Sequence, residues 1–294
     1  MQSFKFLLVV LAILGASLSM GFTLSMNSVL KPFQDGKALK IISGLQNFDA
    51  DLVEKVSRAA YFGGATHVDI ACDPELVKVA LKAGNGIPVC VSAIEPEKFV
   101  PAVAAGATMV ELGNFDSFYE SGRTFSAEEV LEMARKTRAL LPNIPMAVTV
   151  PHTLELSEQA ELAVALEAAG ADVIQTEGKY NIAPSKGGIQ GAMEKAVPTL
   201  AAARTLSAAV GVPVLAASGL SEVTAPLALA AGARGVGVGA AVNRLGDEVL
   251  MTAVVRGVAA SLGLEGRRQA PAAAAPVVPV AFRNQEEVFD CSYF

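Results

Sequence analysis

The chain has 294 residues, of which 52% are hydrophobic, and its formal net charge at pH 7 is -6. This length suits one large domain with tails, and the acidic balance, the lack of Trp and the absence of a basic block mixed with aromatic residues argue against nucleic-acid binding. Its 3 Cys residues show no Cys-x-x-Cys spacing and it has only 2 His residues, so we expect no disulfide framework, no metal site and no cofactor.

Residues 1–31 are expected to form a presequence that is removed. Lys5 gives a basic start, and residues 6–18 form an apolar run that is too short to span a bilayer comfortably. Small residues follow this run, as at a signal-peptidase site, although an uncleaved membrane anchor is the alternative interpretation. The mature protein is therefore expected to have no stable membrane anchor.

The second part of this presequence, residues 22–31, is rich in Ser and Thr and contains no acidic residue, which is typical of a transit peptide. A signal peptide followed by a transit-like segment that opens with Phe22 resembles the two-part presequence of algae with secondary plastids. This resemblance implies delivery to the chloroplast stroma. Secretion is the alternative, and the missing disulfide pattern weighs against it.

Two short signals alternate along the rest of the chain. One is Ala-Gly-Ala or a near match, which ends an apolar helical segment, because Gly at a helix end adopts the left-handed conformation without a steric cost. The other is Gly or Asn, an apolar residue, Pro and a second apolar residue. It opens an apolar strand, because Pro at the start of a strand loses no hydrogen bond of the sheet. The first signal occurs at 64–66, 105–108, 169–172 and 231–234, and the second at 86–89, 143–146 and 211–214. A helix–strand pair repeated in this way predicts a parallel barrel.

We therefore predict the α/β class and a single (β/α)8 TIM barrel over residues 32–265. The expected strands are 38–44, 66–71, 87–93, 107–112, 145–150, 171–177, 212–217 and 233–239. The expected helices are 50–62, 74–83, 96–104, 126–140, 156–169, 191–209, 222–231 and 247–262. Residues 266–294 follow as a Pro/Ala-rich linker with an acidic and aromatic end, interpreted as a loosely ordered tail or, alternatively, as a docking peptide.

Acidic residues lie near the C-terminal ends of several expected strands, where barrels of this kind place their chemistry. These are Asp69, Glu111 and Glu177, each within an otherwise apolar strand, and Lys179 follows closely. A buried carboxylate is costly unless it is paired or used, so these four residues are candidate catalytic groups for general acid–base chemistry. Paired charges that fill the barrel interior are the alternative. His152 fits a structural role or a catalytic role equally well.

A glycine-rich group of residues lies at the end of the barrel sequence. The seventh strand ends at Ser218 and Gly219, and the eighth contains Gly237 and Gly239. Loops after these strands commonly bind phosphate through backbone N–H groups, and Gly lets the backbone approach an anion closely. We therefore predict that these four residues bind phosphate, with tight packing of small residues as the alternative. The long loops at 114–125 and 178–190 are candidate lids.

Several longer motifs resemble one known family. They include IISGLQNFD at 41–49 and ELGNFD at 111–116, and others lie at 68–71, 91–96, 148–153, 174–179 and 217–226. Over about residues 36–262 the chain resembles the plastid and cyanobacterial family named hypothetical chloroplast reading frame twenty-three. The resemblance implies a barrel of the ribulose-phosphate-binding type in a plastid or cyanobacterial setting, and it supplies no reaction, substrate or catalytic residue. The presequence and the Pro/Ala-rich tail depart from the compact family pattern.

Three functions of different classes remain open at this point. The first is an enzyme, a lyase or isomerase, that moves protons on a small phosphorylated metabolite. The second is a barrel without catalysis that senses a metabolite or serves in regulation or assembly. The third is a structural partner of a plastid complex, recruited through the C-terminal tail. Fold alone does not choose between them. The expected partners are a phosphorylated small molecule and either a second copy of the chain or a plastid protein.

Overall fold

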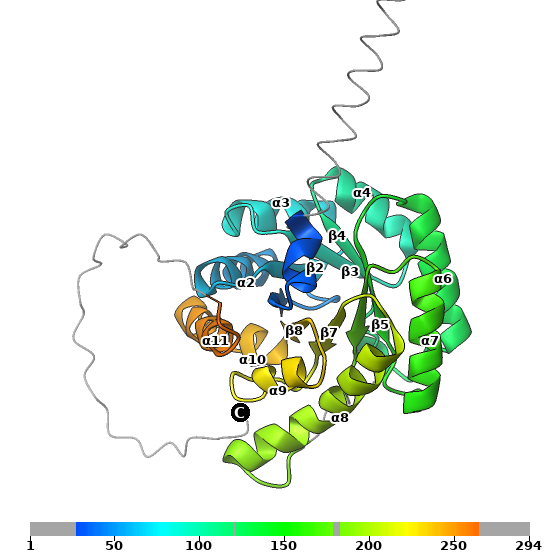
Figure 1. Cartoon of the computed structure of the whole chain (residues 1–294). Helices are drawn as coiled ribbons and strands as arrows, with labels where there is room; N and C mark the ends of the chain where they lie inside the picture. Colours follow the sequence, from blue (N-terminus) through cyan, green and yellow to red (C-terminus); the bar gives the residue numbers. More distant parts are fainter. Residues whose placement is uncertain (1–27, 120, 179–182, 265–294) are drawn as a thin grey trace, which may run out of the picture.

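The computed structural model describes residues 28–119, 121–178 and 183–264. Their parallel strands close into a barrel in the order β1-β2-β3-β4-β5-β6-β7-β8, which confirms the predicted TIM barrel (Figure 1). The strands are β1 (Ala38–Ile42), β2 (His67–Ala71), β3 (Val89–Ala93), β4 (Met109–Leu112), β5 (Met146–Val150), β6 (Val173–Thr176), β7 (Val214–Ala217) and β8 (Gly235–Val238). Because β8 pairs with β1, the last strand of the chain completes a sheet that the first one began.

The helices surround this barrel. They are α2 (Ala50–Gly63), α3 (Pro74–Ala83), the short 3-10 helix η1 (Pro96–Lys98), α4 (Phe99–Ala104), α5 (Asp116–Tyr119), α6 (Ala127–Leu140), α7 (Leu156–Ala168), α8 (Gly188–Ala209), α9 (Ala225–Ala230), α10 (Ala240–Asn243) and α11 (Glu248–Ser261). The sequence did not predict α5 or α10, which lie in the connections after β4 and β8. Both are single short turns without an apolar periodicity of their own.

Several helices begin at side chains that can accept hydrogen bonds from the first turn. Asp49 and Asp73 accept from backbone N–H groups of α2 and α3, and Ser126 does the same for α6. Helix α2 is followed by Gly64, whose φ of 94° is the left-handed conformation expected at the Ala-Gly-Ala signals. Local signals thus set where each helix meets the neighbouring strand.

Alternate residues of the strands share the inner face of the barrel and form two layers. The lower layer, toward the N-terminal ends of the strands, is apolar and contains Ala38, Cys90, Met109, Ala147, Val173 and Leu215. The next inward residues form a buried polar layer, which consists of Lys40, Asp69, Ser92, Glu111, Thr149 and Gln175. At this level β7 and β8 contribute only Ala217 and Gly237, which pair in the sheet. The polar layer therefore extends from β1 to β6 and stops at β7.

A helical turn at 28–34 closes the lower end of the barrel. Phe33 is fully buried, and its ring centroid lies 4.9 Å from that of His67 on β2. The His67 ring nitrogen Nε2 lies 2.9 Å from the carbonyl oxygen of Val29, and burial lowers the pKa of His67 to about 4. Near neutral pH this histidine is therefore an uncharged part of the core.

This turn changes the expected boundary of the presequence. The sequence placed residues 28–31 outside the fold, but they belong to the turn, and the side chain of Val29 is buried. The Ser- and Thr-containing, acid-free composition of the whole segment 22–31 concealed a short helical turn at its end. Residues 1–27 and the tail at 265–294 lie outside the described residues.

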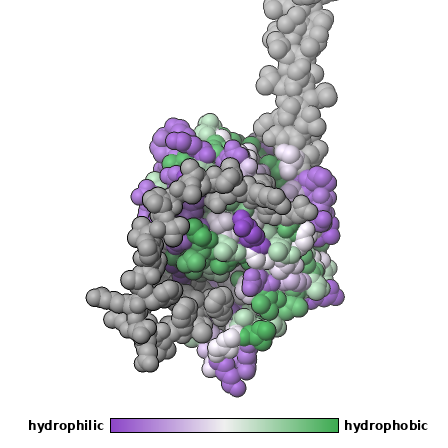
Figure 2. Space-filling view, turned by 90° about the vertical axis from the view of Figure 1, so that its left-hand side faces the viewer, coloured by the Kyte–Doolittle hydropathy of each residue, from purple (hydrophilic) through white to green (hydrophobic). Residues whose placement is uncertain are grey.

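The outer surface is mixed in character. On the face that carries α2 and α11, hydrophobic areas lie beside polar ones (Figure 2). Phe48, Val249 and Leu250, at the beginnings of these helices, are exposed apolar side chains. Within the described ranges, none of the helices combines the length and the apolar character needed to cross a membrane. A protein partner or a second copy of the chain stays a prediction.

Candidate functional site

An ion cluster lies at the centre of the polar layer. The ammonium group of Lys40, on β1, contacts Oε2 of Glu111 on β4 and lies 3.9 Å from Oδ2 of Asp69 on β2. All three side chains are buried. Asp69 and Glu111 were predicted from the sequence, but Lys40 was missed. The signal was available, because a lone Lys in the apolar strand Ala38–Ile42 is as costly to bury as a lone carboxylate.

Neutral side chains hold the carboxylate of Glu111 from several directions. Its Oε1 accepts hydrogen bonds from Gln175 Nε2 at 2.6 Å, from Asn114 Nδ2 at 3.2 Å and from Thr149 Oγ1 at 3.3 Å. With Lys40 on Oε2, both oxygens of Glu111 are occupied. Glu111 therefore serves as the hub that joins β1, β4, β5 and β6.

Asp69 has a looser set of partners. Ser92 Oγ donates to its Oδ1 at 2.6 Å, and Asn114 Nδ2 lies 3.4 Å from its Oδ2. Asn114 reaches both carboxylates from the end of β4, where its φ of 57° is left-handed, a conformation that Asn tolerates better than most residues. A single amide thus links the two acidic residues.

The buried charges change how these groups titrate. Burial by itself lowers the pKa of Lys40, but the charges of Glu111 and Asp69 outweigh this effect and raise it, so the amine stays protonated. Burial raises the pKa of Asp69 to about 7, against the opposing charge of Lys40. Lys40 is therefore a fixed positive charge rather than a free amine nucleophile, and Asp69 can exchange a proton near neutral pH.

Glu177 lies just beyond β6 in a second cluster. Its Oε1 accepts the backbone N–H of Asp116 at 2.8 Å, and its Oε2 accepts the hydroxyl of Tyr119 at 2.6 Å. The backbone N–H and the ring nitrogen Nδ1 of His152 each lie 3.1 Å from the same Oε2. Glu177 thus joins the connections that follow β4 and β5.

Burial beside Glu177 raises the pKa of two neighbouring groups. Burial and the charge of Glu177 raise the pKa of Tyr119, which keeps the phenol as a donor. Burial, helped by Glu177, raises the pKa of Asp116 to about 6. The other ring nitrogen of His152, Nε2, has no hydrogen-bond partner among the described residues, and this side chain is 18% exposed. A carboxylate on one ring nitrogen and a free second nitrogen is the arrangement of an oriented acid–base histidine.

The four expected catalytic residues do not form one set. Asp69 and Glu111 share the cluster around Lys40, whereas Glu177 belongs to the cluster of His152 and Tyr119. Lys179 lies outside the described residues.

The turn after β7 has an unusual backbone. Ser218 and Gly219 have positive φ angles of 87° and 66° in succession. Their backbone N–H groups donate to no acceptor in the described part of the chain, while the Ser218 carbonyl accepts a 2.7 Å hydrogen bond from Thr199 Oγ1. A Cβ at Gly219 would also collide with the carbonyl oxygen of Lys195. Successive backbone N–H groups without a partner are a feature of anion-binding turns, which makes this turn a candidate anion site.

The two glycines of the β8 region differ from each other. A Cβ at Gly237 would lie 2.9 Å from the Cβ of Ala217, so close packing of β7 and β8 accounts for this glycine. A Cβ at Gly239 would have no neighbour closer than 3.7 Å, and α10 begins at the next residue. That Cβ would make ordinary van der Waals contact with Ile42, so Gly239, which lies at the same end of the barrel as Ser218, has room for a small side chain. No group of three or more His, Cys, Asp or Glu residues that could hold a metal ion occurs within the described ranges.

Comparisons with known proteins give several matches to the sequence. The family described as "Protein of unknown function (DUF561)" matches residues 25–267. A protein described as "Uncharacterized protein ycf23" from Cyanophora paradoxa is 43% identical over 221 residues, which cover 75% of this chain and 90% of that protein. The protein of the same description from Pyropia yezoensis is 36% identical over 229 residues, covering 78% of this chain and 83% of that protein.

Solved structures share the fold at low sequence identity. Thiamine phosphate pyrophosphorylase from Pyrococcus furiosus superposes with a TM-score of 0.53 at 19% identity, covering 78% of this chain and 96% of that one. The structure of 3-hexulose-6-phosphate synthase gives a TM-score of 0.53 at 16% identity, covering 76% of this chain and 99% of that one. At these identities the likeness establishes a TIM barrel and nothing about the reaction.

Proposed function

The chain belongs to the family described as protein of unknown function DUF561, and for this member we propose a barrel that binds a small phosphorylated metabolite and performs proton-transfer chemistry of the lyase or isomerase kind. The observation that carries the proposal is the pair of adjacent, unbonded backbone N–H groups at Ser218 and Gly219. A phosphate group there would accept both, and Gly239, just before α10, lies at the same end of the barrel. The solved barrels compared above are themselves named for phosphorylated compounds.

The metabolite's carbon skeleton would extend from this phosphate site over the polar layer. One feature of that layer favours a ligand: the buried Oε1 of Gln175 has no hydrogen-bond partner among the described residues. Unsatisfied buried acceptors are rare in native proteins, and a ligand hydroxyl would satisfy this one. Gln175 lies on β6, next to the strands that lack polar inward side chains.

We assign the chemical roles from the contacts. His152 gives and takes a proton at Nε2, and Glu177 orients its ring. Asp69 is the second proton-exchanging group, Lys40 supplies positive charge near a developing enolate, and Glu111 holds Lys40 in place. Lys179 remains a candidate for the same charge-stabilising role. Each of these assignments depends on the metabolite bound at Ser218.

The alternative function is a barrel that binds or senses a metabolite without converting it. One observation favours it: both oxygens of Glu111 and both oxygens of Glu177 are already occupied by partners within the protein. Saturated carboxylates of this kind also occur in polar interiors that only support the fold. Ligand binding alone therefore does not separate the two functions.

Ligand-dependent stability tests the anion site. A panel containing ribulose phosphate, glyceraldehyde phosphate and inorganic phosphate would be added during thermal unfolding. A ligand at about 100 times its dissociation constant adds ~2.7 kcal/mol of stability by mass action. Gly239→Asp should abolish this gain through charge repulsion, whereas Gly239→Ala should keep it, because a Cβ fits there. An unchanged melting temperature of the wild type across the panel would refute the site.

Hydrogen exchange separates an enzyme from a binding module. With the ligand identified, NMR in deuterated water would follow exchange of its carbon-bound hydrogens. An enzyme should exchange them, and Glu177→Gln should slow the exchange by about 100-fold with binding retained, because the acid–base group His152 loses the carboxylate that orients it. Binding without any exchange by the wild type would assign the barrel to the non-catalytic class.

We also propose that the chain is delivered to the plastid stroma by a two-part presequence. The apolar run at 6–18 and the acid-free segment that follows support this, and the turn at 28–34 limits the removable part to the residues before it. A fluorescent protein fused after residue 27 should reach the stroma, and the same fusion without residues 6–18 should stay in the cytosol. Retention of the first fusion outside the plastid would contradict the proposal.

A further inference from the structure

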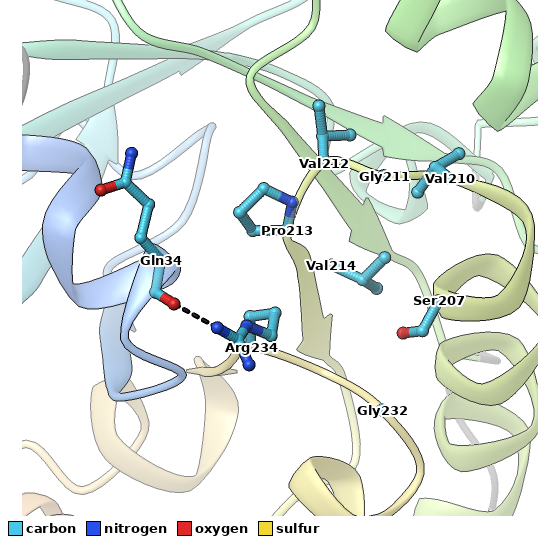
Figure 3. A pocket seen from close by; sticks show the side chains of 9 residues that line it. All are labelled: Gln34, Ser207, Val210, Gly211, Val212, Pro213, Val214, Gly232 and Arg234. Atoms are coloured by element: carbon cyan, nitrogen blue, oxygen red, sulfur yellow. Dashed lines mark hydrogen bonds between the residues drawn. The ribbon is translucent and has the colours of Figure 1, made fainter.

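A cavity of about 370 Å³ lies where the chain enters β7 and β8 (Figure 3). Ser218 and Gly239 follow the other ends of these two strands. It is bounded by the turn at 28–34, the end of α8, the first residues of β7 and the segment before β8. Ligand pockets of small molecules begin at about 300 Å³, so this cavity has room for one small molecule.

One wall of the cavity carries an unused hydroxyl group. Ser207 Oγ, on the last turn of α8, is buried and has no hydrogen-bond partner in the described part of the chain. It faces Gly232, because a Cβ built on that glycine would lie 3.3 Å from the hydroxyl oxygen. A hydroxyl within a helix can bond to a carbonyl of the preceding turn, and this one does not. It is therefore free to bond to a ligand.

The cavity also has a positive charge. Arg234 precedes β8, and its Nη2 donates to the carbonyl oxygen of Gln34, the bond drawn as a dashed line in Figure 3. A guanidinium has five N–H donors, and in the described part of the chain this carbonyl is the only acceptor that the Arg234 side chain has. The remaining N–H groups are available to an anion.

The rest of the lining is apolar or neutral. Val212, Pro213 and Val214 supply the apolar part of the lining where the chain enters β7, with Pro213 on the side of Arg234 and Val214 on the side of Ser207 (Figure 3). The carboxylate near the cavity belongs to Glu167, and it accepts the backbone N–H groups of Gly211 and Val212 at 3.0 Å each. These two bonds hold the Glu167 carboxylate against the backbone just before β7. Among the residues that line the cavity, Arg234 has the charged side chain.

We propose that this cavity is a second binding site, for a small organic anion with an apolar body, such as a branched or aromatic carboxylate. The carboxylate accepts N–H groups of Arg234, the apolar body lies against Pro213 and its neighbouring valines, and the Ser207 hydroxyl bonds to a polar atom of the ligand. This site is independent of the phosphate site, since it shares no residue with it.

Calorimetric titration with benzoate and with 3-methylbutanoate tests the site. At least one of these probes should bind the wild type with one-to-one stoichiometry. Arg234→Gln should weaken binding by about tenfold or more, because a charge-assisted hydrogen bond contributes that much. Ser207→Leu should abolish binding by filling the cavity. Arg204→Gln, at an exposed position of the same helix α8, is the matched control and should bind as the wild type does.

Two further measurements distinguish loss of the ligand contacts from damage to the fold. Because Arg234 also bonds to the carbonyl oxygen of Gln34, its substitution could destabilise the fold, and the unfolding midpoint of each variant is therefore measured. Ser207→Leu tests the cavity while the bond between Arg234 and Gln34 stays intact. Gly239→Asp should not affect the two probes, since it changes the other end of the barrel. The proposal is overturned if neither probe binds the wild type more tightly than about 10 mM, or if Ser207→Leu leaves binding unchanged.

Discussion

Glu177 binds His152 through two different atoms of the histidine. The backbone N–H and the ring Nδ1 of His152 both lie 3.1 Å from Oε2 of Glu177. The backbone contact fixes where the residue sits, and the ring contact fixes how the imidazole is turned. Nε2, which has no partner among the described residues, therefore keeps one direction, which is the preorganisation that the proposed acid–base role requires.

The hydroxyl of Tyr119 should contribute measurably to this arrangement. Tyr119→Phe removes a 2.6 Å hydrogen bond to a buried carboxylate, so we expect a loss of about 1.5–3 kcal/mol in the free energy of unfolding. Tyr61→Phe is the control, since Tyr61 OH accepts a bond from Asn85 at an exposed position. Urea denaturation of both variants checks this, and equal losses would contradict it.

The buried charge of Lys40 should be essential for stability. Lys40→Met leaves two carboxylates without their counter-charge and should cost about 3–5 kcal/mol, as the loss of one partner of a buried ion pair does. Lys78→Met breaks an exposed pair with Glu75 and should cost about 1 kcal/mol or less. Combining Lys40→Met with Glu111→Gln should recover part of the loss. Strictly additive effects of the two changes would argue against the cluster.

Asp69 should make stability depend on pH. Its carboxyl binds a proton more tightly in the folded chain, because burial raises its pKa from 3.8 to about 7. Its contribution to stability is therefore full below pH 3.8 and is lost as the pH rises through about 7. The unfolding free energy of the wild type, minus that of Asp69→Asn, should fall steadily across this range. Asp116 and His67 titrate in both proteins, so their contributions cancel when one unfolding free energy is subtracted from the other. A difference that stays flat or rises with pH would contradict the raised pKa of Asp69.

The turn at 28–34 should be part of the stable fold. Phe33→Ala removes a fully buried ring and should cost about 3–5 kcal/mol. Phe48→Ala makes the same chemical change at a side chain that is 62% exposed, and it should change stability by about 0.5 kcal/mol or less. Thermal and urea unfolding of a chain that begins at Ser28 provide the reference. Similar small effects of both substitutions would show that the turn does not close the barrel in solution.

The sequence predicted the barrel well because its signals are local. Gly and Pro mark the helix ends and strand starts directly, so the order of elements needed no knowledge of tertiary contacts. Burial of Asp69 and Glu111 also followed from their position in apolar strands. Lys40 was missed because polar residues were sought at the strand ends, whereas this side chain begins deeper in β1.

Other features depend on contacts that no local pattern reveals. The bond between Tyr119 and Glu177 joins residues 58 positions apart and exists because α5 forms in the loop after β4. The positive φ of Ser218 follows from tertiary packing, since Thr199 on α8 holds its carbonyl. The same composition that indicated a transit peptide also concealed the buried turn that begins at residue 28.

The uneven polar layer has a consequence for selectivity. A ligand bound at the proposed anion site would face the polar side chains of β1 to β6 on one side and Ala217 and Gly237 on the other. Mirror-image compounds attached at the same anchor would turn their hydroxyls toward opposite flanks. Only one of the two could pair with Gln175, and the other would leave its own polar groups against bare backbone and methyl groups. The proposed site would therefore bind one enantiomer of a ligand in preference to the other, and the preferred enantiomer would depend on where the polar residues stop around the ring.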